Sequence, residues 1–268
     1  MNLAELKKIS KSIRLQVLRV GFRSGKGHLG GTYSCVDLLV SLYYGDALKF
    51  NVWNPTHPDR DRFILSKGHA CLALYPILLD LGFISQEKFN SYGHNGGLGA
   101  QLDVSISGVD YNTGSLGHSL GVCAGMALAA KLDNKDYMAY TIIGDAECDT
   151  GSFWEAIKFA GQLQLSNLCC IIDRNRFSVT EEIEYDPLLD NPTMLRHFNW
   201  DFCEIDGHAF NEINNALKNA RDADKPTMII ANTIKGKGVS FMESSVKWHH
   251  SMPTEKEYKM AEKELLDG

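Results

Sequence analysis

Short apolar runs alternate with amphipathic stretches through the second half of the chain. Runs typical of buried strands occupy residues 137–143, 167–173, 202–205 and 227–232. Stretches with helical periodicity, at 153–163 and 212–221, lie among them. Strands and helices that alternate in this way form βαβ units on a parallel sheet. The pattern therefore predicts an α/β fold, with helices on both faces of a doubly wound parallel sheet.

The beginning of the chain is predicted to be helical. Apolar residues between positions 3 and 20 recur every three or four places, which indicates an amphipathic helix that ends near Gly21. The stretch RSGKGHLGG (23–31) is too rich in glycine for regular structure. A second helix is expected to begin after Ser34, its N-cap, and to run to Tyr44.

Residues 63–83 are predicted to begin as a short strand and to continue as an apolar helix, in which Pro76 introduces a kink. Residues 92–117 are rich in glycine and short polar side chains, which predicts a long irregular segment of functional importance. No internal repeat or linker is visible, so residues 1–268 are predicted to form a single domain.

Composition narrows the classes of function. The chain has 268 residues, of which 44% are hydrophobic, enough for a large buried core. The net charge is -6 and the basic residues are dispersed, so no nucleic-acid partner is expected. No apolar run reaches the roughly 18 to 20 residues that span a bilayer, so no membrane association is expected. The seven cysteines lack C-x-x-C spacing, which favours reduced thiols in the cytoplasm.

Two polar residues follow two of the apolar runs. Asp145 comes two residues after Ile143, and Asn175 comes two residues after Asp173. Ligands bind outside the carboxyl ends of parallel strands, so both side chains reach one edge if the two strands are neighbours. Carboxylate and amide oxygens suit Mg²⁺, which completes its coordination with waters and substrate phosphates. The spacing predicts a magnesium and phosphate site.

The segment Gly114-Ser115-Leu116-Gly117 offers a second support for an anion. Its glycines are predicted to open a helix whose free N–H groups and positive dipole end suit a phosphate group. A diphosphate would thus have two supports.

The acidic stretch GDAECDTGSFWEAI (144–157) also fits a simpler structure. Ser152 and Glu155 match a capping box, so helix initiation accounts for part of the stretch. From the acidic cluster alone, a metal site at Asp145 and a solvated, capped loop both stay open. No role is assigned to the other two acids, Glu147 and Asp149.

Several histidines share a glycine-rich context. His28, His69 and His94 lie in GKGHLGG, SKGHA and YGHNGG, and WHH occupies 248–250. One histidine is more often a packed or surface residue than a catalyst. Four such contexts suggest a common pocket, although spacing leaves their convergence open.

Together these motifs resemble the transketolase family. The stretch from Gly144 to Asn175 resembles the thiamine diphosphate motif that begins with G-D-G and ends with N. The N-terminal third of transketolases is similar, in the same order, to SGKGHLGG, LSKGHA, GH at 93–94, TGSLG, ANTIKGKGVSFME and WHH. The resemblance covers nearly the whole chain and implies the thiamine-diphosphate-binding fold.

The resemblance implies which positions hold the metal and the cofactor. The Mg²⁺ ligands would be the Asp145 and Asn175 side chains and the Phe177 carbonyl. The residues that match contacts to thiamine diphosphate are Gly114, Ser115, Leu116, Gly144, the amide of Ala146, His69 and His249.

The same resemblance implies catalytic roles for His28, His69, His94 and His249, which match residues that line the substrate channel or contact the cofactor. Imidazoles with pKa values near ~6.5 exchange protons around neutrality, which suits proton transfer with the substrate.

The resemblance reaches only the diphosphate-binding part of transketolases. The glutamate that activates the aminopyrimidine and the basic residues that hold sugar phosphates lie in later domains of that family. We therefore expect an N-terminal subunit of a split transketolase, paired with a C-terminal transketolase subunit in an α2β2 heterotetramer. With this partner it would transfer a two-carbon ketol unit from a ketose (or ketose phosphate) to an aldose (or aldose phosphate). Alone it is expected to be inert.

Four positions depart from the family pattern. Ala146 replaces the second Gly of G-D-G and brings a methyl group near the diphosphate. His118 stands where many relatives have Gln, and His250 where Gly is usual. Thr150 stands where relatives often carry a Glu associated with communication between paired active sites, so such coupling is not implied here.

Three other functions remain open from the sequence. The α subunit of a 2-oxo-acid dehydrogenase carries a similar cofactor motif, although the histidine contexts argue against it. A Mg²⁺-dependent phosphohydrolase could use the three acids of GDAECD without a partner. A scaffold subunit would keep the fold without activity.

Overall fold

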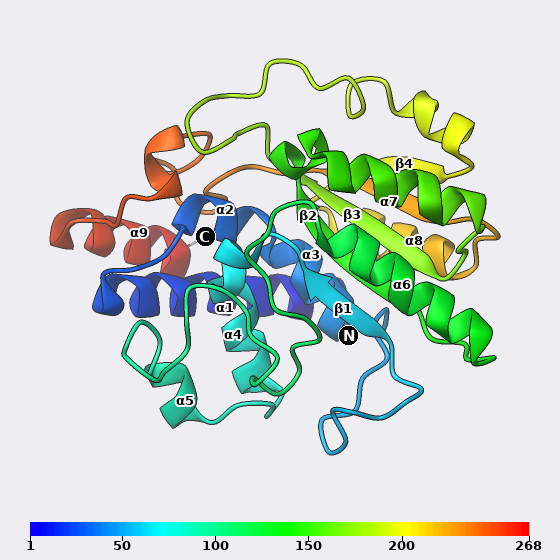
Figure 1. Ribbon diagram of the computed structural model, residues 1–268. Coiled ribbons are helices and arrows are strands. Elements are labelled where there is room, and N and C mark those ends of the chain that lie inside the picture. The colour runs from blue at the N-terminus through cyan, green and yellow to red at the C-terminus, as the bar shows by residue number, and fades with distance from the viewer. Residues whose placement is uncertain (268) are drawn as a thin grey trace.

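A five-stranded parallel sheet forms the centre of the computed structural model, which describes residues 1–267 (Figure 1). The strands follow the spatial order β1-β2-β3-β5-β4, and every neighbouring pair is parallel. Their bounds are β1 (Arg62–Leu65), β2 (Ala139–Gly144), β3 (Leu168–Arg174), β4 (Asp201–Asp206) and β5 (Thr227–Asn232). The predicted α/β class is confirmed.

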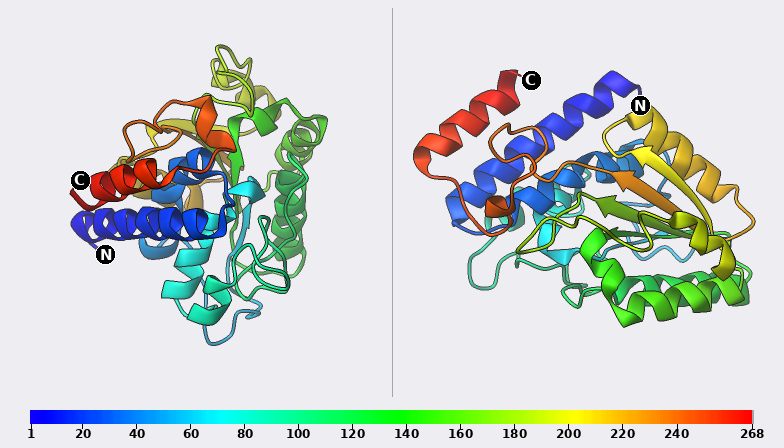
Figure 2. Two further views of the ribbon diagram at one scale, coloured as in Figure 1. Left: turned by 90° about the vertical axis from the view of Figure 1, so that its left-hand side faces the viewer. Right: turned by 90° about the horizontal axis from the view of Figure 1, so that it is seen from above.

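Helices cover both faces of the sheet. Helices α6 and α7 lie on one face, and α1, α3 and α8 lie on the other (Figure 2). The helix bounds are α1 (Leu3–Ser24), α2 (Leu29–Ser34), α3 (Val36–Tyr44), α4 (Cys71–Asp80), α5 (Gln86–Asn90), α6 (Ser119–Leu132), α7 (Gly151–Gln162), α8 (Phe210–Arg221) and α9 (Glu255–Asp267).

The strands supply both apolar layers of the core. Along β2, Ala139 and Ile143 pack on the side of α6 and α7, whereas Tyr140 and Ile142 pack on the other side. Successive side chains of a strand point to opposite faces, so a strand buried on both faces reads as a continuous apolar run. This is why the strand segments were visible in the sequence.

Helix α1 has a defined start and stop. The Asn2 side chain accepts a hydrogen bond from Glu5 N at 3.0 Å, and the Glu5 carboxylate accepts one from Asn2 N at 2.8 Å, which completes a capping box. Gly25 ends the helix in the left-handed conformation, with φ of 65°. The helix thus runs past Gly21, where the periodicity predicted its end, because the true C-terminal glycine comes one turn later.

The glycine-rich stretch 23–31 is not irregular throughout, as predicted, because α2 begins at Leu29. Gly30 and Gly31 lie inside this buried helix. A β-carbon on Gly30 would lie 3.1 Å from the Trp248 carbonyl oxygen, tighter than most real contacts. These glycines therefore allow close packing of a helix.

The expected N-cap at Ser34 is also wrong. Ser34 ends α2, and α3 begins at Val36 with Cys35 as its cap residue. The hydroxyl of Ser34 instead donates a hydrogen bond to Asp173 Oδ2 at 2.7 Å. A long-range buried partner has replaced the local capping bond.

The irregular segment 92–117 contains no helix or strand, as predicted. Helix α4, which holds Pro76 in its interior, helps to anchor it. The buried Tyr75 hydroxyl lies 3.0 Å from the Gly99 carbonyl oxygen and 3.1 Å from that of Gln101. The segment is therefore tied to the core before it reaches the sheet edge.

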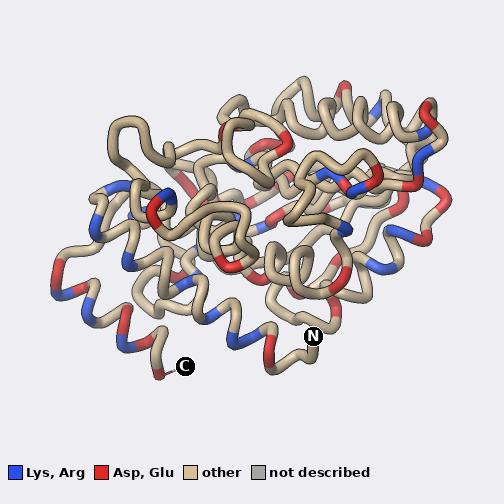
Figure 3. Tube along the Cα trace, turned by 90° about the horizontal axis from the view of Figure 1, so that it is seen from below, with Lys and Arg blue, Asp and Glu red and all other residues tan. Residues whose placement is uncertain are grey.

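Charged residues of both signs are dispersed along the chain (Figure 3). They mix along α1 and α9, which pack side by side (Figure 2). Arg19 Nε of α1 donates to Glu262 Oε1 of α9 at 2.9 Å. Among residues 1–267, no helix is both long and apolar enough to cross a membrane.

Two helical glycines test the packing of the α6 and α7 layer. A β-carbon on Gly161 of α7 would lie 1.7 Å from the Phe198 carbonyl oxygen, so Gly161→Ala forces backbone apart. Overpacking of this kind costs about 1–3 kcal/mol, and we expect urea unfolding to show that loss. The control is Gly125→Ala in α6, which meets nothing within 4 Å and is expected to raise stability by about 0.5–1 kcal/mol. Equal stabilities of the two variants would contradict the packing.

Candidate functional site

Asp145 and Asn175 meet at the carboxyl edge of the sheet. Strands β2 and β3 are neighbours, and the terminal pair Gly144 and Asp173 precedes the two polar residues. Asp145 Oδ2 accepts a hydrogen bond from Arg176 N at 2.6 Å. The prediction that both side chains reach one edge is confirmed.

The carboxyl group of Asp145 is almost fully buried. Burial and the neighbouring Asp173 raise the pKa of Asp145 to about 7, although Lys67 acts in the opposite direction. A buried carboxylate of this kind is stabilised by a divalent cation, which favours the ionised form. Asn175 adds a neutral amide oxygen, which accepts from Phe177 N at 3.1 Å. The donor chemistry fits a hard cation such as Mg²⁺.

Lys67 and Asp173 form a buried ion pair beside this edge. Burial favours neutral Lys67, but Asp173 outweighs that effect, so the pKa of Lys67 is raised. Asp173 also accepts hydrogen bonds from the hydroxyls of Ser34 and Thr233. The pair thereby joins the segment after β1, the end of β3, helix α2 and the segment after β5.

Glu147 is a structural tie that the sequence did not reveal. Its Oε2 accepts from Ser66 Oγ at 2.6 Å and from Gly117 N at 2.9 Å, and its Oε1 accepts from Gly144 N at 3.0 Å. These donors belong to the ends of β1 and β2 and to the turn before α6. No local pattern could identify partners that lie 30 and 81 residues away.

The Gly114–Gly117 turn precedes a helix but does not open it, which corrects the prediction. Helix α6 begins at Ser119, with the exposed His118 as its N-cap residue. Gly114 and Gly117 have φ values of 127° and 77°, which L residues rarely adopt. The left-handed backbone turns the chain away before the helix can start.

The capping box predicted at Ser152 and Glu155 is not formed. Helix α7 begins at Gly151 with Thr150 as its N-cap residue, so Ser152 lies within the first turn. Thr150 Oγ1 donates to the Glu147 carbonyl oxygen at 2.8 Å. A β-carbon on Gly117 would lie 1.8 Å from Thr150 Oγ1, so the two loops are in close contact.

Three of the four histidine contexts converge. The ring centroid of His28 lies 5.2 Å from that of His69, 5.5 Å from that of His249 and 4.8 Å from that of His250. His94 does not join them. It is exposed in a turn whose Gly93 carbonyl accepts from Lys26 Nζ at 2.8 Å.

A cavity of about 230 Å³ connects the histidines to the sheet edge. Of the predicted site residues, Ser115 and His94 do not line it. The lining residues are His28, Gly31, Lys67, His69, Gln101, Gly114, Leu116, Gly144, Asp145, Ala146, Glu147, Asn175, Phe177, Ser178, Val179, Lys235, His249 and His250.

Lys235 fixes the tautomer of His249. Its Nζ lies 3.1 Å from His249 Nδ1 and donates to the Ser178 carbonyl at 2.8 Å. An ammonium group only donates, so Nδ1 accepts and the ring proton lies on Nε2. Sequence analysis missed both cavity lysines, because a lysine beside glycines resembles an ordinary surface charge.

The histidines of the cavity are less basic than free imidazole. Burial, with the cations Lys235 and Lys67 nearby, lowers the pKa of His249 to about 3 and that of His69 to about 2. Both rings are therefore neutral at pH 7, each with one donor and one acceptor. The expectation of pKa values near ~6.5 is wrong for these two residues in the unliganded chain.

The fold and the site define a class, an α/β protein with a hard-cation site and a glycine turn at the carboxyl edge of its sheet. Residues 6–266 match the family model described as "Transketolase, thiamine diphosphate binding domain". The chain belongs to this family.

Similar proteins include relatives of the same length and longer enzymes. A subunit of the apulose-4-phosphate transketolase of Phocaeicola vulgatus is 39% identical over 278 residues, which cover 100% of this chain and 96% of the relative. The 6-deoxy-6-sulfo-D-fructose transketolase subunit SqwG of Clostridium sp. (strain MSTE9) is 41% identical over 248 residues, covering 90% and 89%. The crystal structure of Campylobacter jejuni transketolase superimposes with a TM-score of 0.91 at 30% identity, and this chain spans 99% of its own length and 43% of that enzyme.

Glu147→Gln tests the structural tie. Glutamine keeps the shape but turns an NH₂ group toward at least one donor, and an unsatisfied buried group costs about 1–3 kcal/mol. We expect that loss in urea unfolding, together with faster hydrogen exchange at the Gly117 amide. The exposed Asp149, two residues away, provides the control Asp149→Asn, for which stability is expected to stay within about 0.5 kcal/mol. An unchanged Gly117 exchange rate in Glu147→Gln would contradict the proposed tie.

Proposed function

We propose that this chain is the N-terminal, diphosphate-binding subunit of a split transketolase. One observation carries the proposal: Asp145 and Asn175 follow neighbouring strands and share a cavity with the glycine turn and the convergent histidines. The match of residues 6–266 to the family model supports it. With a second subunit, the chain would transfer a two-carbon ketol unit from a ketose to an aldose.

The residues of the cavity fit Mg²⁺ and thiamine diphosphate. Asp145, Asn175 and the Phe177 carbonyl would hold the metal ion, whose charge would stabilise the buried Asp145 carboxylate. The Gly114 to Leu116 turn would offer backbone amides to the diphosphate. The amide of Ala146 donates to Asp145 Oδ1 at 2.9 Å in this structure, and it would be shared with the ligand.

The two lysines of the cavity provide the charge that an anionic cofactor requires. Lys67 and Lys235 are both buried and line the cavity together with His69. A bound diphosphate would offset their effect on the imidazoles and raise the low pKa values of His69 and His249. Cofactor binding would thus bring these residues closer to the range in which they exchange protons.

Thiamine diphosphate, when bound, supplies the electron sink for carbon–carbon bond cleavage. The chain's own residues would bind the substrate and move its protons. His249 presents its Nε2 proton as a donor, because Lys235 occupies Nδ1. His28, which also lines the cavity, would accept or return protons of the ketose hydroxyls. His94 lies outside the lining, so a role for it depends on the assembled enzyme.

A partner subunit would complete the active site. Two relatives named as transketolase subunits match this chain over nearly their whole length, whereas the chain spans 43% of Campylobacter jejuni transketolase. We propose that a C-terminal transketolase subunit carries the remaining domains, in a cytoplasmic α2β2 heterotetramer.

The donor is proposed to be a ketose that carries an anionic group. The relatives are named for apulose-4-phosphate and for 6-deoxy-6-sulfo-D-fructose, sugars with a phosphate and a sulfonate group. The residues that select the anionic group are expected on the partner, as the family resemblance implies.

A phosphohydrolase that uses the three acids of the GDAECD stretch is not favoured. Both carboxylate oxygens of Glu147 are engaged by protein donors, and Asp149 does not line the cavity. The match to the transketolase family likewise weighs against the 2-oxo-acid dehydrogenase α subunit.

Asp145→Ala tests the metal and cofactor site. Loss of the carboxylate is expected to abolish Mg²⁺-dependent binding of thiamine diphosphate, measured by calorimetry on the chain mixed with its partner. The fold is expected to stay intact by circular dichroism. The control Asp149→Ala removes an exposed acid of the same loop and is expected to bind normally. An unchanged affinity in Asp145→Ala would remove Asp145 from the site.

A second test concerns the partner. The purified chain with thiamine diphosphate and Mg²⁺ is expected to show no ketol transfer, because the residues that activate the aminopyrimidine are expected elsewhere. Addition of a polypeptide with the missing transketolase domains is expected to produce transfer from sugar phosphates, followed by product analysis. Ketol transfer by the chain alone would refute the split-subunit proposal.

A further inference from the structure

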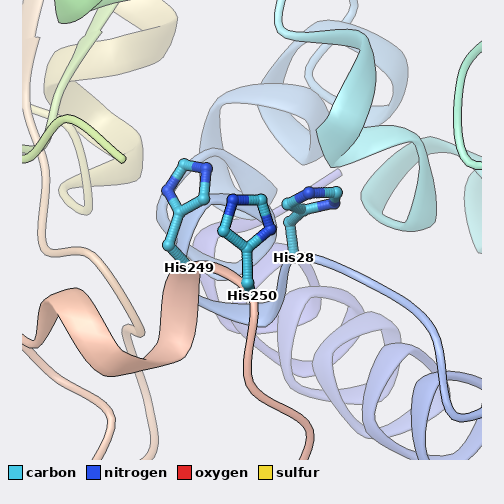
Figure 4. A group of neighbouring side chains, drawn as sticks. All are labelled: His28, His249 and His250. Atoms are coloured by element: carbon cyan, nitrogen blue, oxygen red, sulfur yellow. The ribbon is translucent and has the colours of Figure 1, made fainter. Parts of the chain in front are cut away.

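His28, His249 and His250 face one another at the cavity (Figure 4). One ring nitrogen from each lies within 4.8 Å of the other two, and the rings of His249 and His250 have centroids 4.6 Å apart. Three nitrogen donors of this kind form the protein ligand set of an open zinc site, whose fourth position is free for another ligand.

A second, independent observation concerns His28. Its Nδ1 atom is buried and has no hydrogen-bond partner among residues 1–267. Buried polar atoms are normally satisfied, and an orphaned one calls for an explanation such as an ion. Helix α2, which begins just after His28, packs against the 3₁₀ helix η4 (Val246–His249) that precedes His250. Core packing therefore holds two of the three rings close together.

We propose that His28, His249 and His250 bind a transition-metal ion such as Zn²⁺ or Co²⁺. Imidazole nitrogens suit these ions, whereas the carboxylate and amide oxygens of Asp145 and Asn175 suit Mg²⁺. The cavity would therefore hold two metal sites of different chemistry.

The three rings have to draw together for binding. Bonds of about 2.0–2.1 Å from Zn²⁺ to each nitrogen place tetrahedral ligand atoms roughly 3.3 Å apart. His250 is exposed, so its side chain can rotate toward the two inner rings at little packing cost. The site is closed by movement of a surface residue.

Lys235 limits the affinity of the site. It occupies Nδ1 of His249, which leaves Nε2 for the metal. Coordination through Nε2 moves the ring proton to Nδ1, so Lys235 loses this hydrogen bond and keeps the one to the Ser178 carbonyl. The site is therefore expected to load reversibly.

A regulatory consequence rests on the proposed function. The metal would sit on histidines that are proposed to contact the ketose, so Zn²⁺ and substrate would compete for the same part of the cavity. His250 would make the enzyme sensitive to transition metals, since family members usually carry Gly at this position.

Titration of the full chain with Co²⁺ tests the site without any assay of activity. Nitrogen ligation in a low-coordinate site gives visible absorption bands much stronger than those of the hydrated ion, and Zn²⁺ is expected to displace Co²⁺ and remove them. We expect one Co²⁺ per chain. His250→Ala and His250→Gln are each expected to weaken binding by at least about tenfold. The control His118→Ala alters an exposed histidine outside the cluster and is expected to bind as the wild type does.

Two results would overturn the proposal: Co²⁺ bands no stronger than those of the free ion, or wild-type affinity in both His250 variants. Asp145→Ala separates this site from the magnesium site. It is expected to bind Co²⁺ normally, and loss of Co²⁺ binding there would assign the ion to the sheet edge instead. Failure of Mg²⁺-dependent cofactor binding in the wild type would count against the proposed function and leave the Co²⁺ result unaffected.

Discussion

The ion pair between Lys67 and Asp173 is the constraint on which the site depends. Removing two charges from water costs several kcal/mol for each ion, and this cost is offset only when other hydrogen bonds complete the pair. Ser34 and Thr233 complete it by donating to the Asp173 carboxylate. The four residues come from segments far apart in the chain, so the pair stabilises only the arrangement in which these segments meet at the sheet edge.

This arrangement gives the cavity two chemically different sides. At the sheet edge, acidic and amide oxygens follow the strands, and the pKa of Asp145 is raised because burial and Asp173 both disfavour its charge. Across the cavity lining, Lys235 and the histidines present nitrogen. A cation and an anion thus each find a complementary surface in one space, as a metal–diphosphate ligand requires.

Glu147 shows why residue type alone misled the sequence analysis. Among three acids in five residues, Asp145 faces the cavity as a candidate ligand, Glu147 ties three backbone segments together, and Asp149 is exposed. Their chemistry is similar and their spacing is short, but a 3₁₀ turn (Asp145–Asp149) points them in different directions. The same carboxylate group therefore serves binding, support or solubility according to where the turn directs it.

The sequence by itself determined the α/β class, the strands and the residues that follow them, because burial on both faces of a sheet leaves continuous apolar runs and places polar residues at their ends. It also determined the family, through an ordered set of motifs. Only the tertiary structure decided that His28 meets His249 and His250 while His94 stays exposed, that Lys67 pairs with Asp173, and that the Ser34 hydroxyl leaves its helix cap. These contacts join residues far apart in the chain, and the energy of burying a polar group depends on its partners in space, which periodicity and spacing do not encode.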